Sequence, residues 1–295
     1  MEDDNGEYAD ARRIWVTAAW VLLGTLAGQL ASVGVLAAFG YDVLDGLADI
    51  AVLPPLVLAC MIAAVQLLGY LLPGLVSAYS LFKSAWPDEV TLAPSPSLRQ
   101  LGIGILAFAL CMPLTVALAE VNASIELAGW QADIEESVAA TLATIIQGES
   151  VATLLVALLI VAVLPAVGEE LVFRGLIQPG LIARTNSAHL GVWLTALVFG
   201  LIHFQFAGLL PRVFLGAVLG FLAHYSERLW VPIVAHFLFN GLQVVALRFG
   251  QIDAEVAERT PLGYESVALL CVGLAGAALA AQLLPRLRPR AEPAA

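Results

Sequence analysis

The sequence predicts an all-α, polytopic bundle of transmembrane helices, with about eight spans and both termini on the cytoplasmic side. Its composition is the first reason, because 60% of the residues are hydrophobic and only 13% are charged. Soluble domains are roughly half apolar and about a quarter charged. The mean hydropathy of +0.90 agrees with a lipid-solvated chain. A formal net charge of −11 without a basic patch argues against a nucleic-acid partner.

Long apolar runs are the second reason. A helix that crosses a membrane needs about 20 mostly apolar residues. The eight candidate runs are residues 14–39, 50–72, 98–119, 151–167 with a polar extension to 183, 188–204, 208–224, 229–247 and 265–284. Ionisable side chains inside such runs are costly and usually functional. The first two runs contain no internal acid, base or histidine, so the candidate functional residues lie later in the chain.

The distribution of basic residues is the third reason, because cytoplasmic loops are enriched in lysine and arginine. If the chain crosses eight times, ten basic residues fall at or near the side of the termini and three fall toward the other side. The ten are Arg12, Arg13, Lys83, Arg99, Arg174, Arg184, Arg228, Arg286, Arg288 and Arg290, and the three are Arg212, Arg248 and Arg259. This asymmetry predicts cytoplasmic termini.

The chain divides into four predicted parts. Residues 1–97 form a tail and two peripheral transmembrane helices. Residues 98–150 hold the third span and an acidic outer segment at 121–149, which we expect to be an amphipathic surface helix or lid. Residues 151–250 form the core in which polar groups interrupt apolar runs, and 251–295 supply the last span and a basic cytoplasmic tail.

Glu169, Glu170 and Arg174 make the first polar pattern of this core. On a helix, Glu170 and Arg174 share a face, so the arginine would neutralise that carboxylate. Glu169 points about 100° away and lacks this partner. A carboxylate in a low-dielectric site takes up a proton more readily than in water and can serve as a general base. The alternative is a cytoplasmic helix end at which all three charges are solvated.

The other two patterns contain histidine. His203 follows Phe199 late in the fifth run, and a single histidine among apolar residues is more often a hydrogen-bonded core group than a catalyst. His236 and Asn240 project to one side of the seventh run. A neutral imidazole and an amide there could both donate hydrogen bonds to one anion, as an oxyanion hole requires. The alternative is a polar contact between helices.

Positions along the helical hairpins test whether these groups can meet. Glu169 and His203 each lie about 16 residues from the turn at 185–187, which places both about 24 Å from it at about 1.5 Å per residue. The second hairpin closes less well, because His203 lies about 23 residues before the turn at 226–227 and His236 about 9 after it. Gly208 and Pro211 suggest an interruption there, which membranes tolerate where the backbone lines a protected cavity.

At these residues the chain resembles the CAAX prenyl endopeptidase type 2 and bacteriocin-processing enzyme family of intramembrane proteases, called the CPBP family. The family pattern is Glu-Glu-x-x-x-Arg, then Phe-x-x-x-His, then His-x-x-x-Asn/Asp on successive helices. All three occur here in that order, as Glu169-Glu170 with Arg174, Phe199 with His203, and His236 with Asn240. The resemblance covers about residues 154–246.

The resemblance implies a role for each motif residue. Glu169, helped by His203, would activate a water molecule, and His236 with Asn240 would hold the oxyanion of the tetrahedral intermediate. Glu170, Arg174 and Phe199 would support the site structurally. No cofactor is then required. The alternative is a zinc ion bound by Glu169, His203 and His236 with an open position for water, although the chain has no HExxH helix.

The favoured hypothesis is therefore an intramembrane endopeptidase that cuts a membrane-associated peptide or a lipid-modified protein, surrounded by membrane lipid in the cell (inner) membrane of a prokaryote. One alternative is a non-catalytic membrane scaffold or immunity-type protein. Another is a small proton-coupled transporter, which the absence of recognisable inverted repeats weakens. Two small-residue pairs, Gly24/Gly28 and Gly216/Gly220, allow close helix contact but leave the oligomeric state open.

Overall fold

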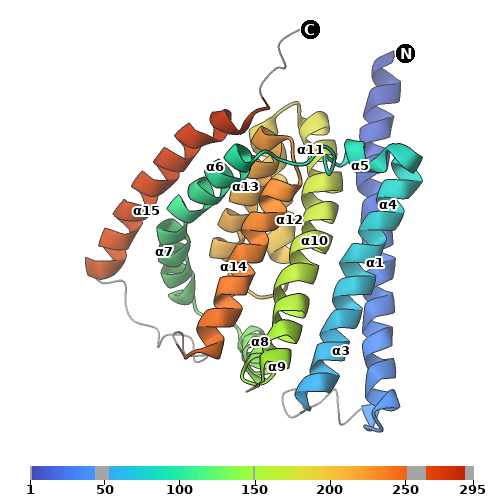
Figure 1. The fold of residues 1–295 in the computed structure, drawn as a ribbon, viewed down its shortest axis with the longest axis vertical. Helices are drawn as coiled ribbons and strands as arrows, with labels where there is room; N and C mark the ends of the chain where they lie inside the picture. Colours follow the sequence, from blue (N-terminus) through green and yellow to red (C-terminus); the bar gives the residue numbers. More distant parts are fainter. Residues whose placement is uncertain (1, 44–52, 149, 251–263, 290–295) are drawn as a thin grey trace.

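The computed structural model describes residues 2–43, 53–148, 150–250 and 264–289, and these ranges form a bundle of helices without strands (Figure 1). The prediction of an all-α polytopic bundle is confirmed. The amino end of α1 (Glu2–Ala38) and the carboxyl end of α15 (Tyr264–Leu283) lie at the same end of the bundle (Figure 1).

The remaining elements follow in chain order. The first half contains α3 (Pro55–Gln66), η2 (Leu67–Leu71), α4 (Leu72–Phe82), η3 (Lys83–Ala85), α5 (Trp86–Glu89), α6 (Leu98–Leu110), α7 (Met112–Ala123) and α8 (Gly129–Ile146). The second half contains α9 (Val151–Ala157), η4 (Leu158–Val163), α10 (Leu164–Glu170), η5 (Leu171–Ile177), α11 (Gln178–Thr185), α12 (Ala188–Leu201), α13 (Leu209–Ser226), α14 (Trp230–Arg248) and η6 (Leu284–Leu287). The segments η2, η4 and η5 are π-helical turns within longer helices.

Seven helices of the described chain are long and apolar enough to cross a membrane, so the chain is an integral membrane protein. They are Asp10–Ala38, Pro55–Glu89, Leu98–Ala123, Val151–Thr185, Leu209–Ser226, Trp230–Arg248 and Ser266–Leu287. The remaining predicted run forms α12, which is apolar but only 14 residues long. At about 1.5 Å per residue it measures about 21 Å, which is less than the roughly 30 Å of a hydrocarbon core.

One basic residue was counted wrongly toward the cytoplasmic loops. Arg174 is buried inside the bundle with only 3% of its surface exposed. The helix that carries it continues to Thr185, so Arg174 is not at a helix end and says nothing about orientation. Arg259 and Arg290 lie outside the described residues.

Both small-residue pairs serve contacts within the chain. A Cβ atom on Gly24 would collide with the backbone oxygen of Leu68, and one on Gly28 would lie 3.0 Å from Val65 Cα. On the other side of the bundle, a Cβ on Gly216 would lie 3.2 Å from the Phe199 ring. The glycines therefore let α1 approach α3 and η2, and let α13 approach α12, as small residues do in membrane bundles.

The acidic outer segment forms α8. Its last residues, Ile145 and Ile146, are buried in a core cluster that includes Leu36, Val57 and Val244. α8 therefore packs across α1, α3 and α14 and covers the end of the bundle opposite the termini (Figure 1). The first part of α8 lies close to the loop between α12 and α13.

Candidate active site

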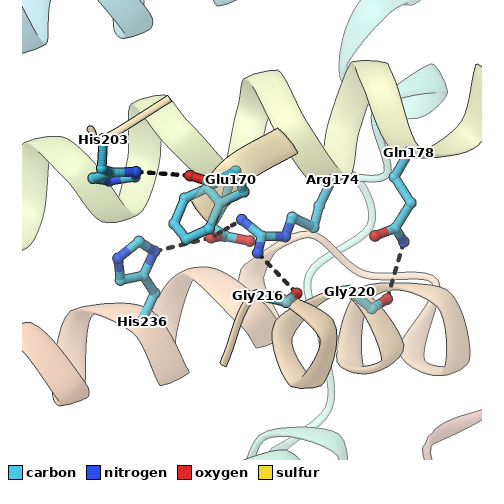
Figure 2. A network of polar contacts seen from close by, with 8 residues as sticks. Glu170, Arg174, Gln178, His203, Gly216, Gly220 and His236 are labelled. Carbon is cyan, nitrogen blue, oxygen red and sulfur yellow. Dashed lines mark hydrogen bonds and ion pairs between the residues drawn. The ribbon is translucent and has the colours of Figure 1, made fainter. Parts of the chain in front are cut away.

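Glu170 is the last residue of α10, and its carboxylate meets Arg174 of η5 and His236 of α14. Arg174 Nη1 donates to Glu170 Oε1 at 2.7 Å, and both side chains are fully buried. Arg174 Nη2 also donates to the backbone oxygen of Gly216 at 2.9 Å, and one turn further along Gln178 Nε2 donates to Gly220 O at 3.0 Å (Figure 2). The predicted pair of Glu170 and Arg174 is brought together. The two bonds to backbone oxygens join η5 and α11 to α13 and fix the register of these segments.

His236 adds a third member to this pair. Its Nδ1 lies 2.9 Å from Glu170 Oε1 (Figure 2). An ionised carboxylate accepts hydrogen bonds only, so Nδ1 carries the proton and Nε2 is the nitrogen left for other partners. His203 is oriented in the same way, because its Nδ1 lies 2.7 Å from the backbone oxygen of Phe199. Both histidines therefore keep Nε2 available.

The Phe199 ring connects the buried pair with both histidines. The guanidinium carbon of Arg174 lies 4.6 Å from the centre of the ring. His203 and His236 approach it edge-on, at centroid distances of 5.0 and 6.2 Å. Cation–π and edge-to-face contacts of this kind add to the packing of the ring. Phe199 thus fixes the positions of three polar side chains from different segments.

A cavity of about 310 Å³ gathers the predicted catalytic residues. Glu169, His203, His236 and Asn240 all line it. Glu170 and Arg174 do not line it, although Glu170 is the next residue in the chain. Most of the other lining side chains are apolar and come from α3, α6, α8, η4, α10, α12, α13 and α14. The two neighbouring carboxylates therefore face different environments.

Glu169 reaches this cavity with few polar partners. It is 4% exposed, and no ion pair to it is found among the described residues. Gln66, at the end of α3, also lines the cavity, and its buried Oε1 has no hydrogen-bond partner among the described residues. A Cβ on Gly168 would lie 3.1 Å from the backbone nitrogen of Leu71, so a glycine at this position allows α10 to approach the first half of the chain.

Asn240 and His236 do not form a ready pair of donors. Asn240 Nδ2 donates to Val161 O at 3.0 Å, where the π-turn η4 interrupts the regular helix. One amide hydrogen is thereby occupied and one is left. A neutral His236 that donates from Nδ1 to Glu170 has a lone pair at Nε2. The predicted donor pair therefore requires His236 as imidazolium, with a proton on each nitrogen.

His203 lies in the loop 202–208 and not within a helix. The residue after it, Phe204, adopts a left-handed conformation with φ of 53°, which turns the chain sharply. α13 is continuous from Leu209, with Gly208 at its amino-terminal cap and Pro211 in its first turn, where a missing N–H is tolerated. The expected interruption therefore precedes the helix, and through it His203 and His236 reach one cavity.

The loop 202–208 is anchored by the acidic outer segment. Asn122 Nδ2 donates to Phe206 O at 2.8 Å, and Asn122 Oδ1 accepts from the Leu210 N–H at 2.7 Å. Glu135 Oε1 accepts from the Ala207 N–H at 2.8 Å. The Trp130 and Phe206 rings meet edge-on at 5.7 Å. α7 and α8 therefore satisfy backbone groups that the loop itself leaves unpaired.

Comparison with known proteins bears on these same helices. Residues 151–242 match the model of the family described as type II CAAX prenyl endopeptidase Rce1-like. The family resemblance is thereby confirmed. A protein named "Putative membrane peptidase YdiL", from Bacillus subtilis, is 34% identical over 77 residues, which are 26% of this chain and 31% of that protein. "Uncharacterized protein YpbD" from the same organism is 25% identical over 119 residues, 37% of this chain and 58% of that protein.

The match to the family model and the matches to the two relatives each cover only part of the chain. The chain spans less than two thirds of the length of either curated relative. No solved structure matches the chain. The family match ends at residue 242, just after the third motif, so it includes all seven predicted site residues and leaves out α1–α8 and α15.

The positions of the described side chains can be compared with the zinc alternative. No three histidine, cysteine, aspartate or glutamate side chains among them are grouped as metal ligands are. Glu169, His203 and His236 line one cavity without forming such a group.

Several polar residues of the site were not predicted. Gln66, Gln205, Arg212 and Gln243 also line the cavity, while Asn122 and Glu135 hold the loop. Gln66 had a usable signal, because it is an amide within an otherwise apolar run. The others follow from contacts between distant segments, which local spacing does not contain.

Proposed function

We propose that the chain is an intramembrane endopeptidase that hydrolyses a peptide bond of a membrane-associated peptide or lipid-modified protein. The observation that carries this proposal is the single cavity that gathers Glu169, Asn240 and both histidines. A buried acid with few polar partners, two oriented imidazoles and an amide match the parts of a hydrolase that uses an activated water.

In the proposed reaction, Glu169 takes a proton from water while the water oxygen attacks the peptide carbonyl carbon. His203 Nε2 helps to orient that water. The oxyanion that forms accepts hydrogen bonds from His236 Nε2–H and from the free amide hydrogen of Asn240. When the carbon–nitrogen bond breaks, Glu169 returns the proton to the departing amine. The products are a carboxylate and a new amino terminus.

Glu170 has a distinct role in this scheme. Its carboxylate contacts His236 Nδ1 at 2.9 Å, and a carboxylate at that nitrogen both orients the ring and stabilises imidazolium. Arg174 donates to the same carboxylate oxygen. Glu170 is therefore a positioning residue for His236 in addition to a structural partner of Arg174.

Substrate access is proposed to come from the side of α1, α3 and α8. A second, wider cavity of about 730 Å³ lies there and shares Ile62, Gln66, Leu142, His203 and Gln205 with the first. Its other lining residues are mostly apolar. An apolar peptide or a lipid chain fits such a surface because its burial removes apolar area from water.

The test compares purified full-length protein with Glu169→Gln in liposomes, using mass spectrometry of an apolar peptide mixture. General acid–base catalysis contributes about 10²–10⁴-fold, so cleavage should fall by that factor while the variant stays folded. His203→Ala and His236→Ala should also lose cleavage. Glu227→Gln, an exposed carboxylate at the far turn, is the matched control. Full activity in all three site variants would sink the peptidase proposal.

Metal independence is a separate part of the proposal. Cleavage should persist after treatment with a chelator, and elemental analysis of active protein should find less than one tightly bound zinc per chain. A stoichiometric zinc ion whose removal abolishes cleavage would restore the zinc alternative.

A further inference from the structure

Arg212 brings a positive charge into the catalytic cavity. It lies in the first turn of α13 and lines the same cavity as Glu169, His203 and His236. Its Nη1 donates to the Gln205 backbone oxygen and its Nη2 to Gln205 Oε1, both at 2.9 Å. Both acceptors are neutral. A guanidinium carries more N–H donors than these two bonds use.

No carboxylate among the described residues forms an ion pair with this cation. Glu135 is close enough to interact with its charge, as is Glu169, but Glu135 Oε1 accepts its hydrogen bond from the Ala207 N–H. An ionised side chain inside a membrane bundle is costly and is usually retained for function.

The surroundings of Arg212 leave its guanidinium room beside the cavity. A Cβ on Gly208 would lie 3.2 Å from Arg212 Nη2, so a glycine there avoids crowding the group. The fork of an arginine matches a carboxylate, with two parallel N–H···O bonds. Such a bond is strongest in a water-poor, apolar site like this one.

We propose that Arg212 binds a carboxylate of the substrate peptide, from either its C-terminus or an aspartate or glutamate side chain. This inference rests on the proposed endopeptidase function. Because Arg212 and Glu169 line one cavity of about 310 Å³, the bound carboxylate lies within a few residues of the bond that is cut. Arg212 is thus the residue that selects where along an apolar peptide cleavage occurs.

The experiment measures binding of fluorescein-labelled apolar octapeptides to full-length protein in nanodiscs. Three peptide sets differ only in charge: a free C-terminal carboxylate, a C-terminal carboxamide, and a carboxamide with one internal glutamate. A Glu169→Gln background keeps the peptides intact. Arg212→Gln and Arg212→Lys are made in that background. Arg248→Gln, which removes a cation outside the cavity lining, is the matched control.

With Arg212 present, at least one acidic set should bind about tenfold or more tightly than the neutral set, as expected for a charge-assisted hydrogen bond. Arg212→Gln should make all three peptide sets bind with equal affinity, and Arg212→Lys should keep part of the difference in affinity. The set that shows the preference identifies the source of the carboxylate. Equal binding of all three sets with Arg212 present, or a preference that survives Arg212→Gln, would overturn the inference.

Two further comparisons separate the possible causes. If Arg212 only stiffens the loop through Gln205, its loss weakens all three sets by the same factor and there is no acid preference to lose, which contradicts the proposal. Cleavage by the chain with Glu169 intact is measured in parallel. Acid preference without cleavage supports the carboxylate site and contradicts the endopeptidase, whereas cleavage without acid preference contradicts only the carboxylate site.

Discussion

The adjacent carboxylates of Glu169 and Glu170 project from different faces of α10 into different environments. Glu170 faces η5 and α14, whose residues Arg174 and His236 both contact one of its oxygens. Glu169 faces the cavity, which Gln66 also lines. A rotation of about 100° between neighbouring helical residues produces this difference. Glu170 is thereby held in a buried ion pair, whereas Glu169 lines the cavity.

The largest expected effect is a loss of stability when the buried ion pair of Glu170 and Arg174 is broken. Glu170→Leu leaves Arg174 buried without its partner, and loss of one member of a buried ion pair costs about 3–5 kcal/mol. Equilibrium unfolding in mixed micelles measures this loss. In contrast, Glu169→Gln should leave the free energy of unfolding within about 1 kcal/mol of the parent, because its carboxylate has no ion-pair partner to strand.

A double variant sharpens the same comparison. Glu170→Leu with Arg174→Leu removes both charges, and replacing a buried pair by apolar residues is often neutral for stability. We expect the double variant to regain most of the stability but not the peptide cleavage, because His236 loses its orienting carboxylate. Recovery of both properties would show that Glu170 has no role beyond its pairing with Arg174.

A smaller effect is expected when the contacts are removed by which the outer segment holds the loop that carries His203. Asn122→Ala strands the Leu210 N–H and the Phe206 carbonyl, and an unsatisfied buried group costs about 1–3 kcal/mol. Cleavage should fall by about tenfold, which corresponds to about 1.4 kcal/mol, and amide exchange at 202–210 should become faster. Gln131→Ala, in the same segment but bonded to Ala128, is the control. Unchanged exchange in the loop would refute the anchoring role of Asn122.

The smallest effect is expected at Gln66, which lines the cavity together with Glu169. Gln66→Leu removes a polar side chain from this cavity, and a polar interaction is worth about 0.5–1.5 kcal/mol, so kcat should change severalfold while stability is kept. Gln29→Leu, which removes an amide lining only the adjoining cavity, should leave kcat unchanged. Equal effects of the two variants would mean that Gln66 acts on the cavity in general and not on Glu169.

Much of the fold could be predicted because apolar length is a local property. The runs, the helical extension beyond Glu170 and the helix at 121–149 all follow from composition and periodicity. The separation of Glu169 from Glu170 also follows, since helical geometry alone rotates neighbouring side chains apart. The apolar runs alone do not fix the number of membrane crossings, because the run that forms α12 yields a helix shorter than a full span.

The details of the site depend on contacts that a sequence pattern does not contain. Which nitrogen of His236 is free depends on Glu170, 66 positions away in the chain. The carbonyl that accepts from Asn240 lies in a π-turn, and no local signal marked that turn. Arg212 was counted only as a charge on the outer side, because its place in the cavity arises from the loop before α13.

The shortness of α12 limits how the molecule can be divided. The helix is followed by the loop 202–208, whose backbone groups need hydrogen-bond partners from elsewhere in the chain. The missing partners come from Asn122 and Glu135, across the predicted boundary at residue 150. A graft of residues 151–250 alone onto another membrane scaffold would therefore carry all three motifs yet misplace His203. The motif helices and the outer segment must be inherited, exchanged or engineered as one unit.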